Sequence, residues 1–204
     1  MLEINKIHQG DCLNLMKDIP DKSIDLVLTD PPYGIDYQGC DRPKETNYNK
    51  IINDNNEINY KQMFNELTRL AKTIIVFGAN NFCQDIPFNG RWLCWDKRLS
   101  AKADKMMGSP FELAWINRQS GYYKMYRVLH GGVVNADATK YHPLRFHPTQ
   151  KPVELLSKIL EDYSKEGDLV LDCFAGSCST AIACKRMGRR FIMIEQDEIG
   201  RAHV

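Results

Sequence analysis

The sequence has almost no net charge and no paired cysteine spacing. Lysine and arginine number 27, and aspartate and glutamate number 26, so the formal net charge is +1 and no overall charge indicates a partner. The seven cysteines are scattered, and none forms a C-x-x-C pair, which excludes the usual zinc spacing and a disulfide framework. We therefore expect reduced, buried thiols and no metal.

The chain also has few signals for targeting or for membranes. The N-terminal MLEINKIHQGD lacks the basic-then-apolar profile of a signal peptide. No apolar run approaches the length of a membrane span, and there is neither an internal repeat nor a low-complexity tract. With 204 residues and 43% hydrophobic residues, the chain is expected to form a single cytoplasmic domain over residues 1–204.

What the sequence does contain is an alternation of strand and helix patterns. Apolar runs predict strands over residues 3–8, 24–30, 73–79, 91–97, 111–118, 169–172 and 189–197. Helical periodicity predicts helices over residues 12–20, 60–71 and 147–163, and after the turn at 173–178. This order favours an α/β fold with a doubly wound, mostly parallel sheet, in which 91–97 and 111–118 form a hairpin-like pair. The polar stretch 34–59 is predicted to be a loop.

The stretch LDCFAGSC, residues 171–178, has the pattern of a strand, a glycine-containing turn and a helix. Such a turn at the carboxyl end of a strand is typical of nucleotide-type sites. The next strand ends at Glu195, 23 residues after Asp172, where an acid can accept hydrogen bonds from a ribose diol. The alternative is a turn that only packs the helix on the strand.

The same turn excludes two kinds of nucleotide site. It lacks the full G-x-G-x-x-G of dinucleotide sites, and no Gly-Lys-Ser/Thr of a P-loop follows it. A ligand with adenosine but without phosphates fits better. S-adenosylmethionine is the candidate with this chemistry.

The stretch TDPPYG, residues 29–34, follows a continuous apolar run and is rich in acceptors. Its prolines restrict the backbone and donate no N–H, Asp30 accepts when ionised, and Tyr33 supplies a flat face. Acceptors beside an aromatic ring suit a flat heterocycle with an exocyclic NH2 group. Hydrogen bonds to Asp30 and to the Pro31 carbonyl would free the amine lone pair to attack an electrophilic methyl group.

Three stretches, DPPYG (30–34), HPTQKPVELL (147–156) and LVLDCFAGSCSTAIAC (169–184), together resemble the S-adenosylmethionine-dependent DNA amino-methyltransferases. The motif order, catalytic first and cofactor last, is similar to the circularly permuted beta group and covers nearly the whole chain. The resemblance implies a Rossmann-like class I methyltransferase fold that acts on a base flipped out of duplex DNA. The D-P-P-Y form is similar to that of adenine-N6 enzymes, whereas cytosine-N4 enzymes more often carry Ser in place of the Asp.

The resemblance also implies roles for single residues. Asp30 and Pro31 would bind the target amine, with Asp30 also beside the cofactor. Pro32 would hold the turn, and Tyr33 would stack on the flipped base. The implied cofactor residues are Asp11 for the adenine, Glu195 for the ribose, and Asp172, Phe174, Ala175, Gly176, Thr149, Gln150 and Lys151 for the methionine part.

The chain departs from the family pattern in two places. Cys178 stands where the family usually has a second glycine, and its side chain is expected to crowd the cofactor or the helix contact. The sequence ends at Val204, where family members usually continue through another helix. Both departures predict reduced activity more than an altered fold.

Residues 113–151 form a basic segment with interleaved tyrosines. They hold six lysines and arginines (Arg118, Lys124, Arg127, Lys140, Arg145 and Lys151), one acid, Asp137, and four tyrosines (Tyr122, Tyr123, Tyr126 and Tyr141). Cations for phosphates and aromatic rings for bases are typical of a nucleic-acid-binding surface, although a solvated basic loop is the alternative. Residues 117–146 are therefore predicted to be a small target-recognition insert. Its length implies a short recognition sequence or help from a second subunit of a homodimer.

We therefore predict a DNA adenine-N6 methyltransferase, with alternatives left open. Methylation of cytosine N4, or of adenine in RNA, would use the same pocket chemistry. A catalytically impaired nucleic-acid-binding protein is a rival from another class, but the intact Asp30 and Tyr33 argue against it. A protein-glutamine methyltransferase would prefer Asn at position 30. The recognition sequence, and a role in restriction-modification, phage DNA marking or regulation, stay open.

Overall fold

Apolar strands form the centre of the structure because they bury side chains on both of their faces. The computed structural model describes residues 1–34, 58–86, 90–98, 109–119, 121, 123–129 and 150–196. In β2 (Ile24–Thr29), Leu26 and Leu28 pack on one side of the sheet and Val27 on the other, each at most 1% exposed. A strand buried on both faces is typical of a parallel sheet between two helix layers, as predicted for residues 24–30.

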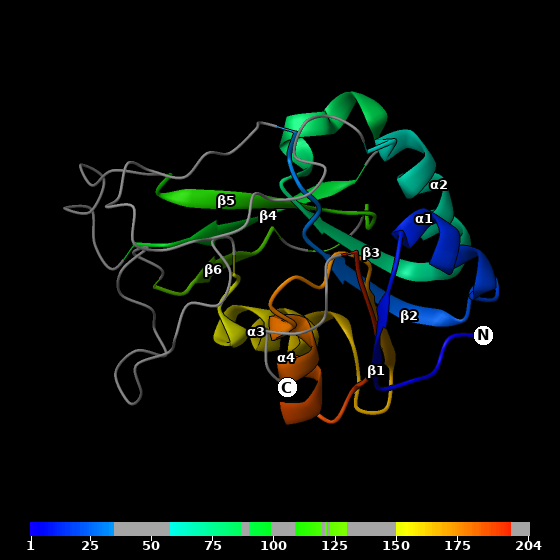
Figure 1. Cartoon of the computed structure of the whole chain (residues 1–204). Coiled ribbons are helices and arrows are strands. Elements are labelled where there is room, and N and C mark those ends of the chain that lie inside the picture. The colour runs from blue at the N-terminus through cyan, green and yellow to red at the C-terminus, as the bar shows by residue number, and fades with distance from the viewer. Residues whose placement is uncertain are drawn as a thin grey trace, which may run out of the picture.

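The described residues form one eight-stranded sheet in the order β1-β8-β7-β2-β3-β5-β4-β6 (Figure 1). Its other strands are β1 (Lys6–Gln9), β3 (Ala71–Phe77), β4 (Arg91–Asp96), β5 (Phe111–Ile116), β6 (Met125–Arg127), β7 (Leu169–Asp172) and β8 (Arg190–Glu195). The first five strands of that order are parallel, β5 runs antiparallel to β3 and β4, and β6 is parallel to β4. The predicted mostly parallel α/β sheet is confirmed, and the expected hairpin-like pair is the β4–β5 pairing.

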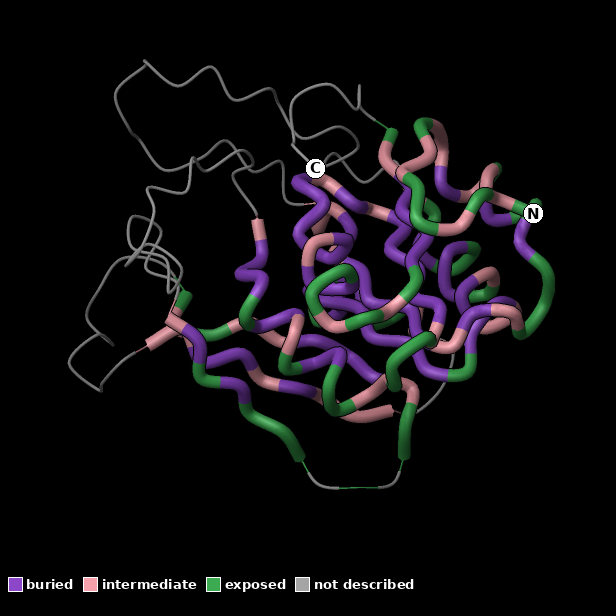
Figure 2. The backbone as a smooth tube through the Cα atoms, turned by 90° about the horizontal axis from the view of Figure 1, so that it is seen from below, coloured by how far each residue is buried: buried purple, intermediate pink, exposed green. Residues whose placement is uncertain are grey.

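Helices cover both faces of the sheet (Figure 1). The helices are α1 (Cys12–Leu15), α2 (Tyr60–Leu70), α3 (Val153–Tyr163) and α4 (Ser179–Arg186), with 3-10 turns at Met16–Asp18 and Ala79–Asp85. Side chains of α1 and α2 enter one core cluster and those of α3 and α4 the other. Figure 2 shows buried residues gathered in the interior of the molecule and exposed residues on its outer turns. None of the helices in the described part of the chain is long and apolar enough to cross a bilayer.

Several boundaries differ from the sequence-based expectations. The first strand begins at Lys6 rather than at residue 3, and the α-helix predicted over 12–20 ends at Leu15 and continues as a 3-10 turn. The helix predicted from residue 147 begins only at Val153, because Pro152 is extended (φ −60, ψ 133) and serves as its N-cap. A proline also disfavours the helical conformation in the residue before it, which here is Lys151. Residues 35–57 of the predicted loop lie outside the described residues.

The parallel strands place all their carboxyl ends at one edge of the sheet. This edge, here called the carboxyl edge, carries Asp11 after β1, Glu195 at the end of β8, Asp172 at the end of β7, Asp30 after β2 and Gly78 after β3. β5 is antiparallel, so its first residues, including Glu112, lie at the same edge. Residues more than 140 positions apart in the sequence therefore meet at one place.

Gly78 is needed at the carboxyl edge because the Tyr33 ring takes the space of a side chain. Gly78 has φ +66, and a Cβ there would lie 2.0 Å from Cε1 of Tyr33. Gly167 also has a positive φ, +82, but nothing lies within 4 Å of its Cβ position. Gly167 therefore offers a matched control with the same backbone strain and no clash.

We expect Gly78→Ala to destabilise the protein more than Gly167→Ala. Backbone strain alone should cost about 1 kcal/mol in both variants. The clash with Tyr33 should add roughly 1–3 kcal/mol in Gly78→Ala, the usual range for overpacking. Chemical denaturation of both variants measures the difference, and equal losses would contradict the role of the Tyr33 ring.

Candidate active site

The turn after β2 presents Asp30 at the carboxyl edge. The Tyr33 hydroxyl donates a 2.7 Å hydrogen bond to Oδ1 of Asp30, three residues back. The Tyr60 hydroxyl of α2 donates to the carbonyl of Pro32 over 2.8 Å, so one backbone acceptor of this turn is already engaged. The prolines also restrict the backbone. The turn is therefore fixed by its own residues and by the hydrogen bond from α2.

Asp30 ends a row of alternating charges, which we call the four-charge row: Lys97, Glu112, Lys151 and Asp30. The Lys151 ammonium contacts Oδ2 of Asp30 on one side and lies 3.3 Å from Oε2 of Glu112 on the other. The Lys97 ammonium contacts Oε1 of Glu112. The Lys151 side chain is only 8% exposed, and a lysine this buried needs carboxylate partners.

The members of the row perturb one another. Burial by itself lowers the pKa of Lys151, but the carboxylates of Asp30 and Glu112 outweigh burial and raise this pKa well above its ordinary value. Burial by itself raises the pKa of Glu112, but Lys151 and Lys97 lower it to about 2. Burial and the charge of Asp30 raise the pKa of Tyr33, so its hydroxyl stays protonated and donates.

Sequence reasoning missed Glu112 and its ion pair with Lys97. Glu112 lies within the apolar stretch FELAWI, whose second half is buried, and a charge in such a strand is a signal that a partner or a function is near. The ammonium of Lys97 pairs with Glu112 and lies 5.0 Å from the Trp95 ring centroid. The partners of both residues come from distant segments, which no local pattern reveals.

The glycine turn after β7 lies against the end of β8. The Ala175 N–H donates to the Ile194 carbonyl over 2.9 Å, and the Gly176 N–H donates to Oε2 of Glu195 over 2.6 Å. Phe174, half-buried, donates its N–H to Oδ1 of Asp172 over 3.1 Å. The structure thus brings together the predicted turn and the predicted acid at the end of the next strand.

Asp11 joins this group from the neighbouring strand β1. Gly10, the residue before it, donates its N–H to the Glu195 carbonyl over 2.8 Å. The Asp11 side chain caps α1 by accepting from the Asn14 N–H over 2.9 Å. Asp11 and Glu195 therefore lie at adjacent strand ends, and their contacts with an adenine and a ribose stay predictions.

Asp172 has a supporting position between the two halves of the edge. Its carboxylate is 4% exposed and accepts from the hydroxyls of Thr29 over 2.8 Å and Thr180 over 2.7 Å. Burial raises its pKa to about 6, although these hydrogen bonds act in the opposite direction. The Asp172 side chain thus ties β7 to β2 and α4, and its predicted contact with a cofactor stays a prediction.

Cys178 adopts the backbone conformation that glycine would take. Its φ is 58 and its ψ is 22, at the N-cap of α4. The side chain is 2% exposed and belongs to the core cluster of α3 and α4, and burial raises the pKa of its thiol to about 12. Cys178 therefore adopts a left-handed conformation and turns its thiol into the core. The expected crowding of a cofactor stays a prediction.

The segment before α3 is divided between described and undescribed residues. Lys151 precedes the helix by two residues, and its ammonium is turned toward Asp30 and Glu112. Gln150 is half-buried at the start of this described segment. Thr149 lies outside the described residues, and the contact of all three with a cofactor carboxylate stays a prediction.

Part of the predicted recognition segment proves to be structural. Tyr126, expected to face bases, is 7% exposed, and its hydroxyl donates to Asp162 over 2.6 Å because β6 packs on α3. Lys124 pairs with Asp162 at 2.7 Å, and Arg127 lies 3.6 Å from Asp96. Tyr123 is 80% exposed. Tyr122, Lys140, Tyr141 and Arg145 lie outside the described residues.

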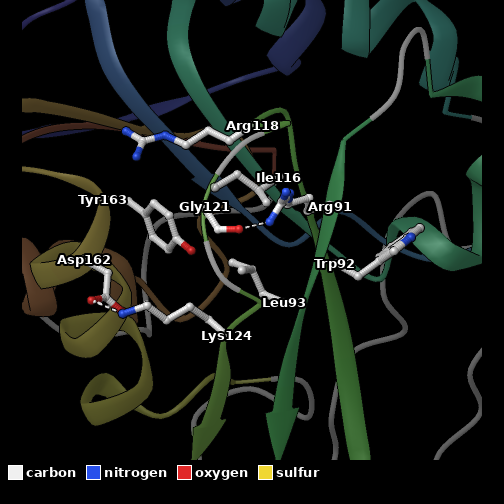
Figure 3. A pocket seen from close by; sticks show the side chains of 9 residues that line it. All are labelled: Arg91, Trp92, Leu93, Ile116, Arg118, Gly121, Lys124, Asp162 and Tyr163. Carbon is white, nitrogen blue, oxygen red and sulfur yellow. Dashed lines mark hydrogen bonds and ion pairs between the residues drawn. The ribbon is translucent and has the colours of Figure 1, made fainter.

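A cavity of about 180 Å³ lies at the opposite end of β4 and β5, against the end of α3 (Figure 3). Its cations already have partners in the fold. Arg91 donates to the carbonyls of Gln119 and Gly121, Lys124 pairs with Asp162, and Arg118 lies 5.4 Å from the Tyr163 ring centroid. Because the cavity lies at the opposite end of these strands, it is separate from the carboxyl edge.

The carboxyl edge defines the class of the protein. A glycine turn after one strand and an acid at the end of the next are typical of α/β proteins that bind a nucleoside-bearing ligand. A family model described as DNA methylase matches residues 95–199, about half of the chain. The chain therefore belongs to the N6/N4 DNA methylase family.

Similar proteins agree with this family. YubD of Escherichia coli (strain K12), which is named as a methylase, is 30% identical over 206 residues, which cover 94% of this chain and 85% of YubD. The solved structure of the M1.HpyAVI–SAM complex has a TM-score of 0.59 at 20% identity and covers 95% of this chain and 93% of that chain. PvuII DNA methyltransferase, titled cytosine-N4-specific, has a TM-score of 0.62 at 16% identity, with coverage of 94% and 82%. The two structures show a shared class I methyltransferase fold.

The buried carboxylate of Asp172 predicts an unusual pH dependence of stability. Its pKa is raised from 3.8 to about 6 in the folded chain, so folding favours the protonated form. Its contribution to the free energy of unfolding therefore falls as pH rises from about 4 to about 6. The quantity to compare is the free energy of unfolding of the wild type minus that of Asp172→Asn. We expect this difference to fall by up to about 3 kcal/mol across that range.

Urea denaturation at a series of pH values measures this difference. Asp162→Asn is the matched control of opposite sign. Burial by itself raises the pKa of Asp162, but its bonds to Lys124 and Tyr126 outweigh burial and lower this pKa in the fold. Its contribution is present above the ordinary pKa and is lost as pH falls. A wild-type minus Asp172→Asn difference that is flat or rises with pH would contradict the assignment.

Proposed function

We propose that this protein transfers the methyl group of S-adenosylmethionine to the N6 amine of a flipped adenine in DNA. The family supports methylation of DNA at an exocyclic amine. The D-P-P-Y form of residues 30–33 supports adenine N6 over cytosine N4. The observation that carries the proposal is the position of Asp30, one strand away from the glycine turn and from Asp172.

Asp30 and its turn are suited to hold an amine by acceptors. The amine of adenine is a poor nucleophile because its lone pair is conjugated into the ring. Hydrogen bonds from the amine to Asp30 and to the Pro31 carbonyl would draw the nitrogen toward tetrahedral geometry. Asp30 and the Pro31 carbonyl would then hold the nitrogen in line with the methyl group that the cofactor supplies. The leaving group would be S-adenosylhomocysteine, and the proton lost from the nitrogen would pass to solvent.

The other residues of the edge fit a nucleoside-bearing cofactor. When bound, S-adenosylmethionine supplies an electrophilic methyl group on a cationic sulfur. Glu195 and Asp11 offer carboxylate oxygens at two adjacent strand ends, suited to the hydroxyls of a ribose and to an adenine amine. The backbone at Phe174 to Gly176 lies beside them, where it would border the methionine part.

The flipped base would stack on Tyr33, whose ring is placed by Gly78 and by its hydrogen bond to Asp30. The same donor-acceptor pattern, an amine beside a ring nitrogen, occurs on the Watson–Crick edge of cytosine. Methylation of cytosine N4 is therefore the second candidate and one outcome of the following test.

Methylated nucleosides identify the reaction and the base together. We expect the purified protein, incubated with S-adenosylmethionine and mixed-sequence duplex DNA, to form N6-methyldeoxyadenosine after digestion, detected by mass spectrometry. Asp30→Ala should abolish this product, because the amine loses its charged acceptor, while cofactor binding stays within about twofold. Formation of N4-methyldeoxycytidine instead would establish the cytosine alternative. The absence of both products would refute the proposed reaction on duplex DNA.

Cofactor binding should depend on Glu195. We expect Glu195→Ala to weaken binding of S-adenosylmethionine by about ten- to a hundredfold, the value of one or two hydrogen bonds to a charged group. Glu195→Gln should lose less, because its amide oxygen can still accept from Gly176. Glu161→Ala, an exposed acid on α3, is the control. Calorimetry measures the dissociation constants, and an unchanged value for Glu195→Ala would move the ribose site elsewhere.

A further inference from the structure

The four-charge row contains a glutamate that the proposed reaction has not used. Glu112 contacts Lys151 and Lys97 with its two carboxylate oxygens, and its side chain is 25% exposed. It comes from β5, whereas Asp30 follows β2 and Lys151 precedes α3. An apolar side chain at this position would continue the strand without burying a charge. Glu112 is therefore costly for the fold alone.

Lys151 is shared between two carboxylates. A lysine ammonium has three donors, and the Lys151 ammonium has three oxygens around it: Oδ2 of Asp30, Oε2 of Glu112 at 3.3 Å and the Tyr33 hydroxyl at 3.4 Å. It also lies 5.2 Å from the ring centroid of Phe77, so the ammonium is enclosed by protein groups. Lys151 can thus release one carboxylate and keep the other.

Asp30 is engaged on both oxygens before any amine arrives. Oδ1 accepts from Tyr33 and Oδ2 contacts Lys151. The charged groups facing Asp30 are Lys151 from the segment before α3, Glu112 from β5 and Asp172 from β7, and Lys97 lies beyond Glu112. Each carboxylate oxygen offers about two lone-pair sites, so an amine that binds Oδ2 shares this oxygen with the Lys151 ammonium and weakens their contact. Glu112 is the second carboxylate that then holds the ammonium.

We propose that Glu112 is a positioning residue for methyl transfer. It holds the Lys151 ammonium beside Asp30, and it becomes the main ion-pair partner of this ammonium when the amine binds to Asp30. The inference rests on the proposed function, because it assigns Asp30 as the amine acceptor. Lys151 is then a counter-charge for Asp30 rather than a ligand of the cofactor carboxylate. The four-charge row contains two cations and two carboxylates both before and after the amine binds.

The inference predicts different effects for the two ends of the Lys151 contact. In Glu112→Gln, Lys151 keeps Asp30 as its one carboxylate, so Asp30 is less available. We expect kcat to fall about tenfold, because the Lys151 ammonium loses one of its two carboxylate partners, with KM for DNA and the S-adenosylmethionine dissociation constant within about twofold. In Lys151→Met, two carboxylates face each other without a cation, so the acid limb of the pH–rate profile should move to higher pH.

Two further variants separate this effect from a loss of structure. Glu112→Gln combined with Lys151→Met should return the acid limb toward its original pH, since only one carboxylate remains. Glu154→Gln is the matched control, because it breaks an ion pair with Lys158 of 3.1 Å on the exposed face of α3, where such a pair contributes little. Its kcat and pH profile should equal those of the wild type.

A measurement without turnover tests the row even if the proposed reaction is wrong. Carbon-13 NMR of the glutamate carboxyls in the wild type should show Glu112 still ionised at pH 4, since its pKa is lowered to about 2 by Lys151 and Lys97. In Lys151→Met its titration should move toward the ordinary value.

Three results would overturn the inference: Glu112→Gln with unchanged kcat and pH profile, a wild-type Glu112 that titrates near 4.5, or Lys151→Met that chiefly weakens cofactor binding. The last result would assign Lys151 to the cofactor carboxylate. Absence of any methylated base would refute the proposed reaction, and the NMR titration would still decide whether the row forms.

Discussion

The hydrogen bond from the Thr29 hydroxyl to the buried carboxylate of Asp172 joins the two halves of the site. Thr29 ends β2, directly before the turn with Asp30, and Asp172 ends β7, directly before the glycine turn. The pairing of β2 with β7 brings these residues together although 142 positions separate Asp30 from Asp172. The parallel arrangement makes this possible, because it places the carboxyl ends of neighbouring strands at one edge. The proposed acceptor for an amine and the proposed site for a nucleoside therefore lie side by side.

Charge is concentrated at this edge in a chain that is almost neutral overall. Asp30 and Glu112 are held by Lys151 and Lys97, and the Lys151 side chain is almost completely buried. Buried ion pairs contribute little to stability on balance, because desolvation offsets the attraction. We infer that their use here is to fix which oxygens carry charge and where these oxygens lie. A family of enzymes that acts on a weakly nucleophilic amine needs such preorganised acceptors more than it needs added stability.

Much of the fold and of the site followed from local patterns. The continuous apolar run at 24–28 predicted a central strand, and the helical spacing at 60–71 predicted α2, because burial on both faces or on one stripe shapes the sequence directly. The glycine turn at 174–176 and the acid at Glu195 were placed correctly relative to each other, since their spacing reflects one strand-turn-helix-strand unit. The basic segment was less well predicted: Tyr126 and Lys124 serve the packing of β6 on α3, and composition cannot separate paired cations from free ones.

By itself, the sequence determined the alternation of strands and helices, the acceptor-rich turn at Asp30 and the family, because each depends on residues that are close in the chain. Only the tertiary structure decided that Glu112 and Lys97 belong to the site, that Lys151 is turned toward Asp30, and that Cys178 takes a left-handed conformation with its thiol in the core. These features depend on which strand ends meet and on how much space is left between them. The antiparallel entry of β5 puts a glutamate at an edge that otherwise collects carboxyl ends, and no local pattern in the sequence specifies that direction.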